Sequence, residues 1–163
     1  MSEHARALLD TAWGVIPHFH ARSIPTSITY YTSVLHFNLG STDISFKYDP
    51  ASEPEPNMCS IYLGPGIRGA NIYIFKRPVE EVLHPSTIMI ALGTEAVDAY
   101  YELLVREGKA EIIKEIEDKR WGYRQFAVQD PDGNRIQFFR FLDGGNPGVE
   151  VAGMTDADTT ESA

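Results

Sequence analysis

Hydrophobic and polar positions follow the same order of elements twice along the chain. Each half is predicted to form a strand, a helix and three further strands. Apolar residues first alternate with polar ones, as in a strand, then recur at i, i+3 and i+4, as in a helix, and then alternate again. In the first half we expect strands over 15–22, 37–48, 58–63 and 70–76, and a helix that begins at Pro25. In the second half we expect strands over 87–92, 110–116, 121–129 and 135–141, and a helix capped by Thr94.

The two halves also share a short sequence at the same place in each helix. Residues 27–31 and 97–101 both end in Tyr-Tyr. A helix covers one face of each small sheet and leaves the other open, so two halves can curve their open faces around a ligand cavity. We predict an α+β fold with two paired βαβββ modules, 15–80 and 81–142, forming a curved mixed sheet around a cavity. The alternative is an unrelated α+β sandwich that repeats Tyr-Tyr by chance.

The two ends of the chain differ from the modules. Residues 1–14 carry one apolar helical stripe, which predicts a short helical arm. So short a helix is marginal alone, so we expect it to dock on the body or on a partner subunit. Residues 143–163 contain five acids, four glycines and no Lys or Arg, which predicts a disordered acidic tail.

Composition narrows the partners. The net charge is −9, and leaving out the five acids of the tail gives −4 for the two modules and the arm. A protein that binds nucleic acid needs a basic face, so this charge argues against nucleic-acid binding. The sequence lacks the roughly 20 successive apolar residues of a membrane span. A single cysteine, Cys59, forms no internal disulfide and is expected to be buried. With no apolar signal region near Met1, a cytoplasmic protein is expected.

Two segments resemble a known superfamily. Residues 27–37, Ser-Ile-Thr-Tyr-Tyr-Thr-Ser-Val-Leu-His-Phe, resemble its first-helix pattern, with His36 at the usual glycine. Residues 121–136, Trp-Gly-Tyr-Arg-Gln-Phe-Ala-Val-Gln-Asp-Pro-Asp-Gly-Asn-Arg-Ile, resemble its last hairpin. The family is the vicinal oxygen chelate superfamily of glyoxalases, bleomycin and fosfomycin resistance proteins and extradiol dioxygenases. The hairpin is most similar to the bleomycin-resistance branch, and the resemblance implies paired βαβββ modules, often in a homodimer.

The resemblance also implies one divalent metal held by the first and last strand of each module. Those positions here are Ile16, Tyr73, Thr87 or Ile88, and Gln137. Isoleucine has no lone pair and a neutral tyrosine is a poor ligand, so we expect no bound metal and no cofactor. His18 and His20 share a strand face with Ile16, which leaves open an atypical two-imidazole site or an acid/base role.

The same alternation predicts a ligand-binding face. In this family the metal-ligand face of each strand is the cavity face, so Tyr73, Gln137 and Phe139 should line the cavity, while Ile136 and Phe138 pack under a helix. The expected ligand-binding residues are Tyr62, Tyr73, Trp121, Tyr123, Arg124, Gln137 and Phe139. The alternatives are purely structural: these aromatic side chains are core residues, and Arg124 pairs with a carboxylate on a neighbouring strand.

Two functions from different classes remain. The first is a metal-free binding protein that sequesters a bulky aromatic or cationic small molecule. The resemblance implies that it does so as a homodimer. The second is a metal-independent isomerase, lyase or cyclase acting on a natural-product intermediate, with His18 or His20 as acid/base and Gln137 or Tyr73 orienting a carbonyl. A metal enzyme such as a glyoxalase or dioxygenase is the third and least favoured possibility.

Overall fold

The computed structural model describes residues 3–12, 14–65, 69–93 and 95–143. Thr94, the predicted helix cap, and the predicted tail after Asp143 lie outside the described residues. The elements in chain order are α1 (Glu3–Leu9), β1 (His18–Ala21), α2 (Ile24–Thr29), the π-helical turn η1 (Tyr30–Val34), β2 (Asn38–Thr42), β3 (Met58–Leu63), β4 (Ala70–Lys76), β5 (Thr87–Ala91), α3 (Ala96–Glu107), β6 (Glu111–Lys119), β7 (Tyr123–Gln129) and β8 (Arg135–Phe141).

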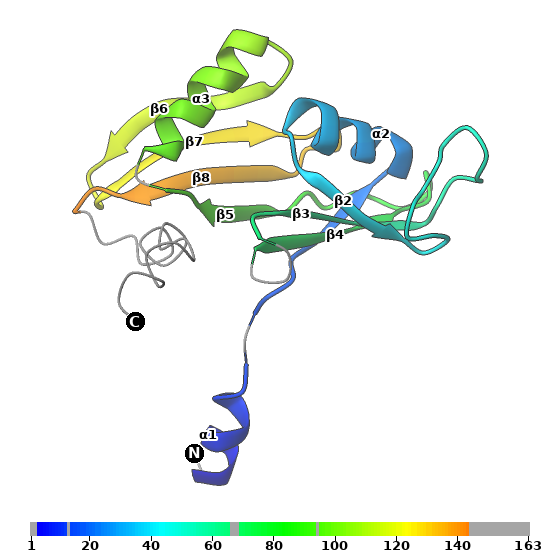
Figure 1. Ribbon diagram of the computed structural model, residues 1–163, viewed down its shortest axis with the longest axis horizontal. Coiled ribbons are helices and arrows are strands. Elements are labelled where there is room, and N and C mark those ends of the chain that lie inside the picture. Colours follow the sequence, from blue (N-terminus) through cyan, green and yellow to red (C-terminus); the bar gives the residue numbers. More distant parts are fainter. Residues whose placement is uncertain (1–2, 13, 66–68, 94, 144–163) are drawn as a thin grey trace, which may run out of the picture.

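The predicted pair of βαβββ modules is confirmed. The first sheet has the strand order β1-β4-β3-β2 and the second has the equivalent order β5-β8-β7-β6. In each sheet the first strand runs parallel to the last, and the remaining pairs are antiparallel. Figure 1 shows α2 and α3 on the same side of the two sheets. We call the opposite side of each sheet its open face.

Strand alternation separates a buried face from the open face. The side chains that point toward the helices are almost wholly buried: Phe19, Ile61, Ile72, Ile74, Phe126, Val128, Ile136 and Phe138. The Phe138 ring lies 5.0 Å from the ring of Tyr100 on α3, so the expectation that Phe138 packs under a helix is confirmed. Cys59 is fully buried in the same core, as expected.

The turn between β7 and β8 fastens the two modules together. The Tyr31 hydroxyl donates to Asp130 Oδ2 at 2.9 Å, and Asn134 Nδ2 donates to the carbonyl oxygen of His20 at 3.0 Å. Asp130 Oδ1 also accepts from the backbone N–H groups of Asp132 and Asn134. The Asp130 carboxylate therefore closes the turn, and the turn also binds the first module.

Two predicted strands of the first module are wrong in extent, and in the second module β6 continues to Lys119 rather than ending at Ile116 and β7 begins at Tyr123 rather than Trp121. The stretch 37–48 forms a strand only over Asn38–Thr42, because the Thr42 hydroxyl oxygen accepts from the backbone N–H groups of Ile44 and Ser45 and closes a turn. Phe46, expected to alternate within the strand, is 89% exposed. The first strand begins at His18 rather than Val15, and Ile16 before it is exposed.

The N-terminal helix stands apart from the body. Figure 1 shows α1 at the end of an extended segment on the side of the sheets away from α2 and α3. Leu8 and Leu9 are each more than half exposed, and α1 contains no buried residue. Its docking on the body or on a partner subunit stays a prediction. Across the described ranges, no helix combines the length and apolar character that crossing a bilayer requires.

Candidate functional site

An aromatic cluster lies on the open face of the first sheet. The register pairs His18 with Tyr73 and His20 with Phe75 across β1 and β4, so these four side chains share one face. The His18 and Tyr73 rings are stacked at 5.8 Å with an interplanar angle of 17°, and the Phe75 ring is 4.9 Å from His18. His18 is exposed, while Tyr73 and Phe75 are half-buried. We call His18, Tyr73 and Phe75 the module-one cluster.

A second aromatic cluster lies on the open face of the second sheet. The Tyr123 and Phe139 rings are stacked at 4.9 Å with an interplanar angle of 29°, and Phe141 packs edge-on against both. Gln137, on the same face of β8, lies between Met89 on β5 and Ala127 on β7. We call Tyr123, Phe139 and Phe141 the module-two cluster.

Tyr62 and Trp121 lie outside these clusters. Tyr62 sits on the open face of β3, paired with Asn71, and is half-buried. Trp121 lies in the turn between β6 and β7 rather than in a strand, and is 57% exposed. The Lys119 ammonium is 5.6 Å from the Trp121 ring centroid, a cation–π contact on the protein's own surface.

Arg124 is directed away from the open face. Its Nε donates to Asp98 Oδ1 on α3 at 2.8 Å, and its Nη1 donates to Asp118 Oδ1 on β6 at 2.7 Å. Of the two roles that the sequence left open for Arg124, this geometry is that of a structural ion pair. We therefore leave Arg124 out of the candidate site.

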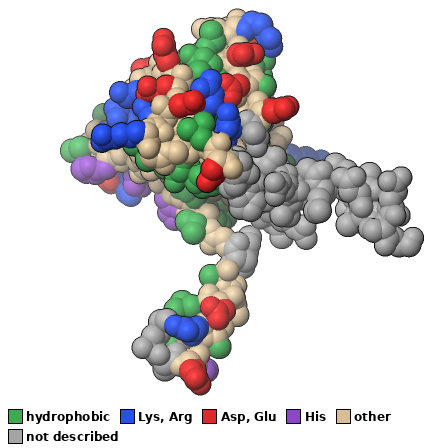
Figure 2. All heavy atoms as spheres, turned by 90° about the vertical axis from the view of Figure 1, so that its left-hand side faces the viewer, with side chains coloured by type: hydrophobic (Ala, Val, Ile, Leu, Met, Phe, Trp, Pro, Cys, Tyr) green, Lys and Arg blue, Asp and Glu red, His purple; other side chains and the backbone are tan. Residues whose placement is uncertain are grey.

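Arg77 is a site residue that the sequence reasoning missed. It follows β4, two positions after Phe75, and its Nη2 lies 3.0 Å from His20 Nε2. Its Nη1 lies 3.3 Å from Glu81 Oε2. Extending the alternation of Tyr73 and Phe75 by one step would have found Arg77. Figure 2 shows histidine side chains next to Lys and Arg side chains at the lower left edge of the body.

The environment of His20 favours its neutral form. Partial burial lowers the pKa of His20, and the nearby positive charge of Arg77 lowers it further. A guanidinium only donates hydrogen bonds, so His20 Nε2 is the acceptor and the ring proton lies on Nδ1. The Nε2 lone pair of His20 is thus already engaged.

The donor set does not fit the metal that the fold family implies. Of the four expected positions, Ile16 offers only hydrocarbon, and Ile88 belongs to the buried row of β5 beside Ile136. Gln137 and Thr87 offer weak neutral oxygens and Tyr73 offers a phenol, which is a poor ligand, whereas hard divalent cations in such sites need several strong donors with at least one anion. Within the described ranges, no three His, Cys, Asp or Glu side chains gather closely enough to hold an ion.

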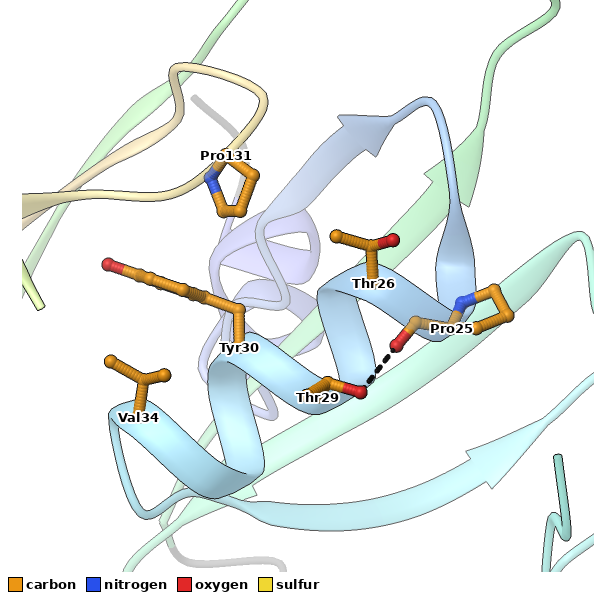
Figure 3. A pocket seen from close by; sticks show the side chains of 6 residues that line it. All are labelled: Pro25, Thr26, Thr29, Tyr30, Val34 and Pro131. Atoms are coloured by element: carbon orange, nitrogen blue, oxygen red, sulfur yellow. Dashed lines mark hydrogen bonds between the residues drawn. The ribbon is translucent and has the colours of Figure 1, made fainter. Parts of the chain in front are cut away.

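A shallow groove lies on the helical side of the molecule instead. It has a volume of about 430 Å³ and lies between α2 and the β7–β8 turn. Figure 3 shows Tyr30 and Pro131 facing one another across it, with the Thr29 hydroxyl donating to the Pro25 carbonyl oxygen. It contains none of the predicted site residues. Its polar side chains are already hydrogen-bonded within the protein, since the Tyr30 hydroxyl donates to the Gln129 carbonyl oxygen at 2.6 Å and the Thr26 hydroxyl donates to Ser23 Oγ. The open faces, with stacked rings and basic side chains, are the better candidate.

Comparison with solved structures supports the fold. TioX from Micromonospora sp. ML1 aligns with a TM-score of 0.60 at 15% identity, over 80% of this chain and 100% of that one. A glyoxalase/bleomycin resistance protein/dioxygenase from Nocardioides aligns at 0.58 and 19%, over 89% and 95%. The bleomycin-binding protein of bleomycin-producing Streptomyces verticillus, complexed with copper(II)-bleomycin, aligns at 0.52 and 17%, over 78% and 95%. At these identities the likeness shows the fold alone.

The sequence itself identifies the family. A search of curated proteins found no significant match. A family model does match residues 16–138, which span strands of both modules from the segment before β1 into β8. The resemblance seen in residues 27–37 and 121–136 is thereby confirmed. The chain belongs to the Glyoxalase/Bleomycin resistance protein/Dioxygenase superfamily.

Proposed function

We propose that this protein binds a planar aromatic small molecule on the open faces of its sheets and holds it without chemical change. The observation that carries the proposal is the module-one cluster, in which an exposed His18 ring lies nearly parallel to Tyr73 beside Phe75. Flat rings with polar edges offer a planar ligand both stacking and apolar contact. The stacked pair of Tyr123 and Phe139 offers the second module's equivalent.

The environment of His20 argues against its acting as a general base. A general base needs a free lone pair within reach of its proton, and His20 Nε2 already accepts from Arg77. The set of potential metal ligands is poor, which argues against the family's metal-dependent reactions. A protein of the same fold, the one from Streptomyces verticillus, is complexed with copper(II)-bleomycin, a bulky small molecule. That likeness supports a binding role for this fold without identifying the ligand.

Titration with a neutral planar probe tests the proposal. We expect 2-naphthalenemethanol to bind saturably, and Tyr73→Ala to raise its Kd about tenfold, because an aromatic contact and its buried area are lost. The fluorescence of the naphthalene ring reports binding, and chromatography of the mixture afterwards shows whether the probe is recovered intact.

Phe46→Ala is the matched control, because Phe46 is an exposed aromatic residue in the loop after β2, outside both clusters. It should leave the Kd unchanged. Absence of saturable binding, or an equal loss in both variants, would overturn the proposed site.

A further inference from the structure

We propose that the aromatic ligand carries an acidic group, such as a carboxylate, that is bound by Arg77 and His20 at one end of the module-one cluster. This inference rests on the proposed function and narrows its ligand to aromatic acids. The sequence suggested an aromatic or cationic compound, and this inference replaces it with an aromatic compound that is negatively charged.

The open face of the first sheet changes character along β1 and β4. His18 pairs with Tyr73 in one row, and His20 pairs with Phe75 in the next. Alternation places Arg77 in the row after Phe75, and its hydrogen bond to His20 shows that it lies on the open face. A flat aromatic surface therefore ends at a guanidinium group, two residues along the strand from a ring.

The Arg77 side chain is fixed in position yet accessible. The guanidinium of Arg22 donates to the backbone carbonyl oxygens of Arg77, Pro78 and Glu81, which holds the segment after β4 against β1. The Arg77 side chain is 41% exposed. A guanidinium has five N–H donors, and the contacts to His20 and Glu81 leave donors that can bind a carboxylate in a forked geometry.

His20 supplies a second donor. Because its Nε2 accepts from Arg77, the ring proton of His20 lies on Nδ1. This neutral Nδ1–H group can donate a hydrogen bond to the same anion that Arg77 binds. The charged and titratable groups that act on His20 are Arg77, His18, His84 and Glu81. Glu81 offsets the charge of Arg77 and His20 is neutral, so the preference for an anion over a cation rests on the N–H donors of Arg77 and His20, which can donate to an anion and not to a cation.

Three probes of one shape and different charge test the inference. We expect wild-type protein to bind 2-naphthoate about ten- to a hundredfold more tightly than 2-naphthalenemethanol, as expected for one charge-assisted hydrogen-bonded contact. We expect 2-naphthylmethylammonium to bind more weakly than the neutral probe. Fluorescence titration in low-salt buffer at neutral pH measures all three Kd values.

Arg77→Gln should abolish the preference for 2-naphthoate over 2-naphthalenemethanol, while saturable binding of the neutral probe is retained. Arg135→Gln is the matched control, because Arg135 is an exposed arginine on β8 of the second sheet. It should keep the full preference, and thermal unfolding of both variants verifies the fold. An equal loss in Arg135→Gln would show that the preference reflects net charge and would overturn the inference.

Failure of this inference is distinguishable from failure of the proposed function. If 2-naphthalenemethanol and 2-naphthoate bind equally, and Tyr73→Ala weakens both, the aromatic site stands and the acidic-ligand inference is overturned. If none of the three probes binds, both are overturned.

Discussion

At the scale of single residues, the ion cluster over the second sheet shows how one carboxylate can hold two arginines together. Arg124 and Arg140 lie directly opposite each other on β7 and β8, on the face toward α3. Like charges in that position repel. Asp98 relieves the repulsion, since it accepts from Arg124 Nε and Nη2 and lies 4.0 Å from Arg140 Nε. The arginine that the sequence offered for ligand binding is therefore used to fasten α3 to its sheet.

Asp98→Asn should lower the free energy of unfolding by about 1 kcal/mol at pH 7, since the partly exposed ion pairs are screened by solvent. The hydrogen bond from Arg124 holds the pKa of Asp98 below its ordinary value. Its stabilisation is thus present above the unfolded-state pKa of about 3.9 and is lost as the pH falls through the folded-state value. Urea unfolding at pH 7 and in acid measures the difference, which should shrink in acid. Glu102→Gln, an exposed change on the same helix, should have little effect at either pH.

At the scale of elements, the helix α2 of the first module ends in an unusual way. After α2 the chain widens into the π-helical turn η1, where the backbone N–H of Leu35 donates to the Tyr30 carbonyl oxygen. His36 then adopts a left-handed backbone with φ of 58°, at the position where the family pattern has glycine. Its Nε2 lies 2.8 Å from Glu107 Oε2 at the end of α3, and Tyr100 on α3 donates to the Leu35 carbonyl oxygen. Contacts to the second module therefore hold this strained position.

His36→Gly and His36→Ala separate strain from contact. Both variants lose the contact to Glu107, but only glycine relieves the left-handed backbone. We expect His36→Gly to be more stable than His36→Ala by about 1 kcal/mol, measured by urea unfolding. Equal stability of the two variants would contradict the idea that backbone strain is stored at His36.

The observed strand boundaries show where the hydrophobic pattern of the sequence predicts the structure and where it does not. Strands β3, β4 and β8 match their predicted ranges, because each is a buried central strand whose alternation is enforced on both sides. The prediction failed over 37–48, where apolar Ile44 and Phe46 alternate without being buried. A side-chain hydrogen bond at Thr42 decides that segment, and alternation carries no signal for it.

For the site, alternation placed Tyr73, Gln137 and Phe139 on the open faces of their strands, and one further step past Phe75 would also have reached Arg77. Residue type alone singled out Arg124, because the residues that neutralise it are distant in sequence. Asp98 lies 26 positions before Arg124 and is brought to it by the packing of α3. Which of two arginines faces a ligand depends on such long-range partners, and these exist only in the folded chain.

At the scale of the whole molecule, one buried core runs through both modules, and the polar groups of the β7–β8 turn lie at their junction. Asp130 is 3% exposed and accepts from the Tyr31 hydroxyl and Asn134 Nδ2. Asn134 also bonds the His20 carbonyl oxygen on β1. Strand β1, which carries His18 of the module-one cluster, is thus positioned by a turn of the other module. Weakening this junction should loosen the whole molecule rather than one half.

Tyr31→Phe tests that junction, with Tyr30→Phe as its control. Removing the Tyr31 hydroxyl leaves a buried carboxylate short of a donor, so we expect a loss of about 2 kcal/mol at pH 7. Tyr30 donates instead to the Gln129 carbonyl oxygen, which does not titrate in this range, so its smaller penalty should be the same at every pH.

The pH dependence of that penalty identifies its cause. Burial raises the pKa of Asp130, and the hydrogen bonds from Asn134 and Tyr31 oppose the rise. A folded-state pKa above the unfolded value means that stability falls as the pH rises from about 4 through the folded-state pKa. Removing the Tyr31 donor raises the folded-state pKa of Asp130 further, because that hydrogen bond stabilises the ionised carboxylate more than the neutral acid. Stability is then lost over a pH range that extends to higher pH. The Tyr31→Phe penalty, measured by urea unfolding, should therefore be larger at pH 7 than near pH 4. A penalty independent of pH would mean that packing, rather than the Asp130 carboxylate, joins the modules at this point.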